Sequence, residues 1–384
     1  MKIAILHAGD LENLALGGVD QYIKNLIRNK KKNEIFVYGT CVYGSYKLGQ
    51  KYAIKNNGLE YYFIPVSDDR TRPLTLGYLR NELRFIKEIS EYDIIYSQRI
   101  EFTIPFVLDK KARNKLVQVI HGSSYYTTLH WGKIKSFIYE FVERLSISIA
   151  KKTNVVLMRE EFGVPYYLKK YKKYKERIGY TKVPVDTKIF RSIDMNKCRT
   201  ELNLPLDKVI IMYGGRVENN PKRVLLFPEI LKKLNENQKK YYLVVIGDGK
   251  DLVNLRLMLQ ESNDEETFNI VGYLENRDIF VKYINASDVN LNISEFEGTC
   301  TSSLEAVACG TPIVSTDAGD IRLFCGDGKN GFIVKNKSEE EIVLQTVKAI
   351  KKIADKQVEM TDAFKRYDCK VVTEELFDQF KQLL

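Results

Sequence analysis

The sequence predicts an α/β protein with two doubly wound domains, each built around a parallel sheet and both facing a cleft. Short runs rich in β-branched and aromatic residues alternate with amphipathic segments along the chain, which is the pattern of βαβ units. A length of 384 residues favours about two cores, and the alternation begins again in the second half. Such sheets bind ligands at the carboxyl ends of their strands, so the loops that follow strands are the expected sites.

The first domain is expected over residues 1–190. Its predicted strands are Lys2–His7, Glu34–Gly39, Leu59–Val66, Asp93–Gln98, Leu116–His121 and Asn154–Met158. Two of the intervening segments place apolar residues on one face at helical spacing, which predicts amphipathic helices. The two faces consist of Leu76, Leu79, Leu83 and Ile86, and of Ile134, Phe137, Ile138, Phe141, Leu145 and Ile149.

The second domain is expected over residues 207–368, after a linker at 191–206. Its predicted strands are Val209–Tyr213, Tyr242–Ile246, Phe268–Val271, Val289–Ile293 and Pro312–Ser315. Helices are expected to begin near Leu225, Leu252, Arg277 and Ser302. The final segment, 369–384, is predicted to be a helix that packs back on the first domain.

The composition is that of a globular protein, with 44% hydrophobic residues. No run of residues has the length and apolarity of a membrane-spanning helix, and Met1–His7 resembles a strand rather than a signal peptide. The six cysteines are scattered without a CxxC pair, so neither a disulfide framework nor a zinc site is expected. These observations predict a cytoplasmic protein.

The net charge of +10 is unevenly distributed along the chain. Residues 1–200 hold 36 Lys and Arg against 20 Asp and Glu, whereas residues 201–384 hold 24 against 30. Basic residues concentrate at 109–115 and at 166–177, where they mix with tyrosines. This asymmetry predicts that the first half faces an anionic membrane surface, on the inner face of the cell membrane. The alternative is a solvated, lysine-rich face. No nucleic-acid-binding motif accompanies the charge, so nucleic acid is not expected as a partner.

The most informative stretch is Ser294–Ser315, in which a strand ends, a polar loop follows and a helix begins near Ser302. Glu297 lies in the loop and Glu305 one turn into the helix, so both carboxylates can face one ligand. Carboxylates accept hydrogen bonds from the vicinal hydroxyls of a sugar or ribose. The same spacing also fits an ordinary helix start in which the glutamates only favour the dipole.

This stretch resembles the retaining GT-B glycosyltransferases of family 4, whose hallmark is two glutamates with seven residues between them. A Leu-Glu-Ala-x-Ala-x-Gly-x-Pro-Val run follows in that family, and residues 304–313 match it with Ile313 in place of the Val, before Val314. The resemblance implies that Glu297 contacts hydroxyls of the donor sugar and that Glu305 contacts the ribose. It also implies that the sugar and phosphates meet the amides of Gly298, Thr299, Cys300 and Thr301. The family often has Phe-Gly where this chain has Thr299-Cys300.

A second element, Tyr213–Arg223, follows the first strand of the second domain. Gly215 allows the backbone to approach a ligand, and Arg216 and Lys222 can neutralise a diphosphate. The family has Arg and Lys at this spacing in that role. Alone, the segment also fits a solvated basic turn.

Further loops resemble family features that bind the donor. They contribute Gly247 and Asp248, Val271 and Gly272, and, after the first strand of the chain, Gly17 and Gly18. Each of these short motifs is also common in ordinary turns that bind no ligand.

His121 ends a predicted strand of the first domain and is interpreted as a catalytic candidate near the acceptor and donor sugar. A histidine at a strand end also serves as a structural hydrogen-bonding group, and this alternative stays open, as it does for His7. The aromatic loop after His121 is a candidate acceptor platform or a self-packing loop; its candidate residues are Tyr125, Tyr126 and His130, with Trp131 beside them.

No Asp-x-Asp motif or cluster with metal-ligand spacing is present in the sequence, so no metal or other cofactor is expected. The predicted reaction is retaining transfer of a hexosyl group from a UDP- or GDP-sugar to a glycan or lipid-linked acceptor, in bacterial cell-surface polysaccharide or glycolipid synthesis. A UDP-sugar epimerase of the same fold, a sugar-binding protein and a DNA-base glucosyltransferase are the alternatives.

Overall fold

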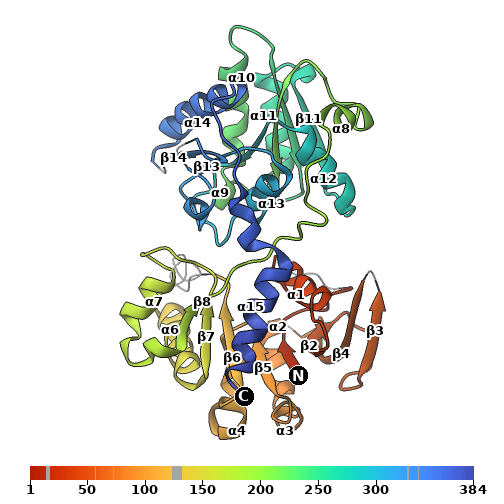
Figure 1. Ribbon diagram of the computed structural model, residues 1–384, viewed down its shortest axis with the longest axis vertical. Helices are drawn as coiled ribbons and strands as arrows, with labels where there is room; N and C mark the ends of the chain where they lie inside the picture. The colour runs from red at the N-terminus through yellow and green to blue at the C-terminus, as the bar shows by residue number, and fades with distance from the viewer. Residues whose placement is uncertain (14–17, 57, 72, 123–131, 327, 336) are drawn as a thin grey trace. The chain divides into compact units, whose positions relative to one another are not determined.

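The computed structural model describes residues 1–13, 18–56, 58–71, 73–122, 132–326, 328–335 and 337–384. These residues form two compact units (Figure 1). One consists of Met1–Pro184 together with Cys369–Leu384, and the other of Val185–Asp368. Each unit has its own sheet, covered on both faces by helices and apolar side chains.

The sheet of the first unit has the strand order β3-β4-β2-β1-β5-β6-β7-β8. All neighbouring strands pair in parallel except β3 with β4, which form an antiparallel edge. The strands are β1 (Lys2–Leu6), β2 (Glu34–Cys41), β3 (Tyr52–Asn56), β4 (Leu59–Asp68), β5 (Ile94–Ser97), β6 (Leu116–Ile120), β7 (Lys152–Val155) and β8 (Ile178–Tyr180). The edge strands β3 and β8 are additions to the predicted set.

The helices of the first unit fall between these strands. They are α1 (Gly18–Arg28), α2 (Leu74–Glu82), α3 (Ile86–Ile89), the 3-10 helix η1 (Glu101–Leu108), α4 (Lys110–Arg113), α6 (Lys133–Ile149), α7 (Val164–Lys170), the 3-10 helix η2 (Lys172–Arg177) and α15 (Cys369–Lys381). The C-terminal helix α15, blue in Figure 1, contacts α1, and the ring centroids of Phe380 and Tyr96 on β5 lie 5.2 Å apart. Residues of α15 thus complete the apolar cluster on one face of this sheet.

The apolar faces predicted for α6 and for the region of α2 are only partly buried. Leu79, Ile86 and Leu145 pack against the core, whereas most of the other residues point outward. On α6, Ile134, Phe137, Ile138 and Phe141 are 55–77% exposed, and only the end of the face, at Ile149, is buried. Leu76 and Leu83 are similarly exposed. The inner side of α6 carries buried Ile147 and also polar contacts: Ser146 donates to the Gln118 side chain on β6 and accepts from Thr103 (3.0 Å). Apolar and hydrogen-bonded side chains together form the inner face of α6, because Ile147 and Ile149 are buried there beside Ser146.

The second unit has the strand order β11-β10-β9-β12-β13-β14, and every neighbouring pair is parallel. Its strands are β9 (Val209–Gly214), β10 (Tyr241–Ile246), β11 (Phe268–Gly272), β12 (Val289–Asn292), β13 (Ile313–Thr316) and β14 (Gly331–Val334). Its α-helices are α8 (Met195–Glu201), α9 (Asn219–Lys222), α10 (Phe227–Asn235), α11 (Leu252–Ser262), α12 (Arg277–Ala286), α13 (Thr301–Cys309) and α14 (Glu339–Ala354), and its 3-10 helices are η3 (Val224–Leu226), η4 (Glu265–Thr267), η5 (Ile321–Leu323) and η6 (Asp362–Tyr367). The prediction of two α/β domains with parallel sheets is confirmed.

Candidate functional site

Three loops of the second unit meet at the carboxyl edge of its sheet. After β9, the amide of Gly215 donates to Ile246 O at 2.9 Å, and after β10 the amide of Gly247 donates to Gly272 O at 2.8 Å. Gly247 has φ +140°, and a Cβ there would lie 1.8 Å from Gly215 O, so no other residue fits this approach. Of the predicted residues, Gly215, Gly247 and Asp248 therefore lie on adjoining loops, and Val271 and Gly272 end the neighbouring strand β11.

Lys222 and Glu297, predicted from separate motifs, are in direct contact. The Nζ of Lys222 donates to Oε1 of Glu297, and Ser294 Oγ donates to the same oxygen at 2.7 Å. The two loops are also joined through the main chain, because the amide of Glu295 donates to Pro221 O at 2.8 Å. Both side chains of the pair are largely buried, at 18% and 14% exposed. The structure thus places a cation and a carboxylate side by side where β12 ends.

Arg216 is held by its backbone while its side chain stays exposed. The buried hydroxyl of Tyr213 donates to Arg216 O at 2.6 Å, which fixes the turn after β9. The guanidinium is 69% exposed and lies 3.4 Å from a carboxylate oxygen of Glu218. Burial, and secondarily the charge of Glu297, raises the pKa of Tyr213 well above its usual value, so this hydroxyl keeps its proton and donates. A guanidinium on a fixed backbone suits an anionic ligand.

Glu305 lies in the second turn of α13 and has a partner that the motifs did not predict. Arg277, the first residue of α12, donates to Oε1 of Glu305 at 2.5 Å. Its guanidinium carbon lies 5.0 and 5.2 Å from the ring centroids of Phe190 and Phe280. Burial raises the pKa of Glu305, and the positive charge of Arg277 opposes this rise. No sequence signal identifies Arg277, because α12 and α13 bring the two residues together only in the fold.

The loop between Glu297 and α13 packs closely on the turn after β13. Gly319 has φ +56°, and a Cβ there would lie 1.8 Å from Gly298 O. The thiol of Cys300 is buried and donates to Ala318 O at 3.4 Å, so it does not cap α13, which begins at Thr301. The amides at the start of this nine-residue helix carry the positive end of its dipole. Gly298, Thr299, Cys300 and Thr301 can therefore contribute main-chain groups to a ligand.

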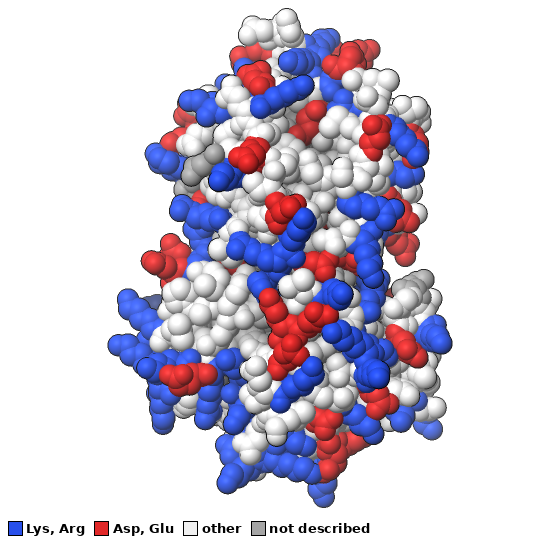
Figure 2. Space-filling view, in the orientation of Figure 1, with Lys and Arg blue, Asp and Glu red and all other residues white. Residues whose placement is uncertain are grey.

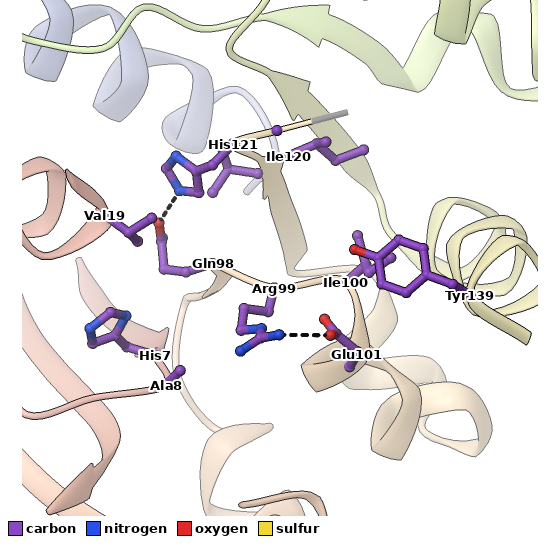
Figure 3. A pocket seen from close by; sticks show the side chains of 12 residues that line it. His7, Ala8, Val19, Gln98, Arg99, Ile100, Glu101, Ile120, His121 and Tyr139 are labelled. Atoms are coloured by element: carbon purple, nitrogen blue, oxygen red, sulfur yellow. Dashed lines mark hydrogen bonds and ion pairs between the residues drawn. The ribbon is translucent and has the colours of Figure 1, made fainter. Parts of the chain in front are cut away.

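The first unit has a cavity of about 260 Å³ among the described residues at the carboxyl ends of β1, β5 and β6 (Figure 3). His121, directly after β6, lines it and donates through Nε2 to Oε1 of Gln98 at 2.8 Å. Burial, reinforced by the nearby His7, lowers the pKa of His121 to about 3. The imidazole is therefore neutral at physiological pH, so His121 can form hydrogen bonds but carries no positive charge.

Other polar side chains line this cavity, and of these Arg99, Glu101 and Tyr139 were not predicted from the sequence. Arg99 and Glu101 form a 3.0 Å ion pair there, and Tyr139 of α6 lines the cavity on the side of Glu101, across from His7 in Figure 3. His7, also in the wall, shares a 2.7 Å hydrogen bond with buried Asp20. Within the described part of the chain, no partner satisfies Nε2 of Gln98. Their one signal was position: residues 98–101 follow β5 at the same edge as His121.

Several predicted residues fall outside the described part of the chain, namely Gly17, Tyr125, Tyr126, His130 and Trp131. Gly18 is described as the exposed first residue of α1. The described residues contain no group of three or more His, Cys, Asp or Glu side chains that could hold a metal ion. None of the helices in the described ranges is long and apolar enough to cross a membrane.

The sequence is similar to those of known glycosyltransferases. The profile of the family described as glycosyl transferases group 1 matches residues 194–368. An uncharacterized glycosyltransferase of Methanocaldococcus jannaschii is 24% identical over 378 residues, covering 90% of this chain and 87% of that protein. The alpha-monoglucosyldiacylglycerol synthase of Acholeplasma laidlawii is 33% identical over 151 residues. The latter alignment covers 39% of this chain and 37% of the synthase.

Solved structures share the fold of the chain. Sucrose-phosphate synthase from Thermosynechococcus elongatus superposes with a TM-score of 0.80 at 16% identity, covering 100% of this chain and 99% of that one. Anabaena HepE in complex with UDP and glucose gives a TM-score of 0.72 at 14% identity, covering 100% of both chains. The two parallel-sheet units are those of GT-B glycosyltransferases. The family match, the glycosyltransferase relatives and this fold together support a GT-B glycosyltransferase.

Proposed function

We propose that the chain is a retaining, metal-independent glycosyltransferase that moves a hexosyl group from a UDP- or GDP-sugar onto a glycan or lipid-linked acceptor. The relatives support glycosyl transfer as the reaction class. The donor, the stereochemistry and the acceptor are our proposal. HepE, which shares the fold, has been solved in complex with UDP and glucose, and this supports a nucleotide-sugar donor.

The contact between Lys222 and Glu297 is the observation that carries the proposal. It places a cation for phosphate oxygens beside a carboxylate that can accept hydrogen bonds from sugar hydroxyls. Arg216 adds a second, exposed cation at the same edge of the sheet. Glu305, one turn into α13, is the candidate partner of the ribose. Two cations and two carboxylates of this kind suit a diphosphate that links a sugar to a ribose.

The proposed chemistry balances without a metal ion. The bond between the anomeric carbon and a diphosphate oxygen breaks, while the acceptor oxygen bonds to that carbon on the same face. The acceptor proton passes to an oxygen of the leaving diphosphate, which therefore acts as the base. Negative charge grows on the diphosphate as it leaves, so fixed cations stabilise the transition state more than the ground state. Arg216 and Lys222 would supply this stabilisation.

We propose that the cavity of the first unit, beside His121, binds the donor sugar or the acceptor. Since its imidazole is neutral, we assign His121 a hydrogen-bonding role toward a hydroxyl, with Gln98 fixing its tautomer. A lipid-linked acceptor is supported by the similarity to a synthase that by name makes a glucosyl diacylglycerol. The basic segments 109–115 and 166–177 also favour it. Cell-surface glycolipid or polysaccharide synthesis would be the setting.

A thermal-shift panel with UDP, GDP, ADP and their sugars tests the donor site. A ligand that binds only the folded state raises the melting temperature, so one nucleotide and its sugar should do so. Arg216→Ala should lose this shift while melting normally without ligand, because its guanidinium is exposed. Arg256→Ala, an exposed arginine on α11, is the matched control. A chain that responds to no nucleotide, or an Arg216→Ala variant with the full shift, would contradict the proposal.

Turnover assays distinguish glycosyl transfer from the alternative, epimerisation of a UDP-sugar. A transferase releases nucleoside diphosphate in proportion to added acceptor and forms a new glycoside, apart from slow hydrolysis. An epimerase leaves UDP attached to a sugar of changed configuration. Candidate acceptors are a polyisoprenyl-linked sugar, diacylglycerol and soluble oligosaccharides. The anomeric configuration of the product, read by NMR, decides between retention and inversion.

A further inference from the structure

The outward side of α6 is an apolar stripe that stays exposed among the described residues. Ile134, Phe137, Ile138 and Phe141, here called the α6 ridge, occupy positions i, i+3, i+4 and i+7 and are 55–77% exposed. Single exposed apolar residues are ordinary on a soluble protein, whereas four large ones on adjacent turns form a continuous surface. Two of the four are phenylalanines. The ridge needs an apolar partner.

The opposite side of α6 is fixed, so the helix cannot turn the ridge inward. Buried Glu143 accepts hydrogen bonds from the hydroxyls of Tyr167 (3.1 Å) and Tyr171 (2.5 Å) and pairs with Lys170 at 3.1 Å. Rotation of α6 would leave this carboxylate buried without its partners, which is strongly unfavourable. The same contacts join α6 to α7 and to the basic segment that follows it.

The surroundings of the ridge are strongly basic. Residues 133–149 and 164–177 together contain nine Lys and Arg against three Asp and Glu, a net charge of +6. All three acids have basic partners: Glu143 as above, Glu140 with Lys170, and Glu176 with Lys175 at 3.8 Å. The exposed cations are Lys133, Lys135, Arg144, Lys169, Lys172, Lys173, Lys175 and Arg177, here called the basic collar. Figure 2 shows Lys and Arg gathered over the side of the first unit where Figure 1 places α6 and α7.

We infer that the α6 ridge and the basic collar form a docking surface for an anionic lipid bilayer. Bulky apolar side chains on one helix face, flanked by lysines, are the composition of helices that lie in the membrane interface. The collar is complementary to anionic headgroups, and the half-buried Tyr166 and Tyr174 suit the headgroup region. This inference rests on the proposed function for its purpose, which is to bring the chain to a lipid-borne acceptor.

Other occupants fit the surface less well. A second copy of this chain would set one basic collar against another, and like charges oppose such a contact. Nucleic acid would match the lysines but leave the apolar ridge facing a phosphate backbone. The segment 109–115 contributes less than its composition suggests. Lys111 pairs with Glu91 at 2.6 Å, and Nζ of Lys115 donates to the carbonyls of Ser90 and Tyr92.

Co-sedimentation with vesicles tests the docking surface. The full chain should bind vesicles of equimolar phosphatidylcholine and phosphatidylglycerol and not vesicles of phosphatidylcholine alone, and added salt should weaken binding steeply. We expect Phe137→Ser/Phe141→Ser and Lys172→Ser/Lys173→Ser each to lower the apparent affinity at least tenfold. Val253→Ser/Leu257→Ser on α11 removes equally exposed apolar side chains from the second unit and should bind normally. Lys170 is left unchanged, because it holds Glu143.

A fluorescent label distinguishes insertion of the ridge from electrostatic adhesion. All six native cysteines are buried, so Phe141→Cys offers a single exposed thiol for a polarity-sensitive dye. Its emission should shift to the blue with phosphatidylglycerol vesicles, and that of Leu257→Cys should not.

The docking surface would be refuted by several outcomes. These are no sedimentation at low ionic strength, a Phe137→Ser/Phe141→Ser variant that binds like the unchanged chain, or a labelled Phe141→Cys variant that keeps its aqueous emission. A dimer that dissociates in the Phe137→Ser/Phe141→Ser variant would identify a second copy of the chain as the occupant. Duplex DNA bound more tightly than vesicles would identify nucleic acid. Nucleotide thermal shifts are measured in parallel, since the ridge lies outside the donor loops. A normal shift without vesicle binding therefore refutes docking and leaves the donor site intact.

Discussion

Arg277 donates to Oε1 of Glu305 at 2.5 Å, so the carboxylate expected to contact the ribose already has a basic partner. Glu297 has the same relationship with Lys222. Each glutamate of the pair is thus charge-compensated within the second unit, which makes burial of both carboxylates tolerable. Arg277 is a positioning residue in this interpretation, because it acts on the donor through Glu305.

Arg277→Ala should raise the KM for the donor about tenfold, the order expected when one hydrogen bond to a charged group is lost. The effect should grow as the pH falls from 8 to 6. Burial raises the pKa of Glu305 and Arg277 opposes the rise, so removal of Arg277 favours the protonated carboxyl, which accepts hydrogen bonds less well. Steady-state KM and kcat across this pH range measure the change. Arg256→Ala is the control, and an unchanged KM at pH 6 would remove Arg277 from the site.

The sequence predicts the strands of both sheets and the loops that follow them, because β-branched runs and glycine turns are local signals. The positions of Arg216, Lys222, Glu297 and Glu305 follow from the same order of elements. Arg277 does not, because its partner depends on how α12 packs against α13. The outward face of α6 was missed for a related reason: a periodic apolar pattern identifies a helix, while the buried contacts of Ile147, Ser146 and Glu143 decide which side faces inward.

Lys222→Ala and Glu297→Gln should each reduce transfer about a hundredfold, since a lost charged contact in such a site corresponds to ~3 kcal/mol. The double variant should lose less than the product of the two factors, because the side chains touch and their effects couple. Turnover of all four proteins in a double-mutant cycle measures this coupling. Strictly multiplicative losses would mean that the two groups act independently.

EDTA should leave transfer unchanged, because Arg216 and Lys222 can balance the charge of the leaving diphosphate. The assay compares initial rates in buffer treated with chelating resin, with and without an excess of EDTA. If activity is lost with EDTA and restored by Mn²⁺ or Mg²⁺, a metal ion rather than Arg216 and Lys222 balances the charge of the diphosphate.

His121 should show no titration between pH 5 and 8. Burial, aided by His7, lowers its pKa to about 3, so the folded chain keeps the imidazole neutral while the unfolded chain is protonated below pH ~6.5. Stability from this group is therefore present above that pH and is lost as the pH falls toward 3. The chain has three histidines, so imidazole NMR signals are assigned with single His→Gln variants. A midpoint near 6.5 for His121 would restore it as a candidate acid or base.

The last prediction concerns Glu82, the final residue of α2, which is fully buried. Neither of its carboxylate oxygens has a hydrogen-bond partner among the described residues, and burial raises its pKa well above the usual value. Above the unfolded pKa of about 4.3, the unfolded chain releases this proton while the folded chain retains it. The free energy of unfolding therefore falls by up to about 1.4 kcal/mol per pH unit until the folded pKa is reached.

Glu82→Gln keeps the shape of the side chain and cannot ionise, so it should be more stable than the unchanged chain at pH 8. The difference should shrink steadily toward pH 5. There the carboxyl is protonated in the folded chain, and a larger fraction of it is protonated in the unfolded chain than at pH 8. Urea unfolding at pH 5, 6, 7 and 8 measures it, provided that one cooperative transition is observed. Glu236→Gln, which removes an exposed carboxylate after α10, controls for the change in net charge. If the difference between Glu82→Gln and the unchanged chain is constant with pH, or grows toward pH 5, Glu82 is ionised in the fold and has a partner.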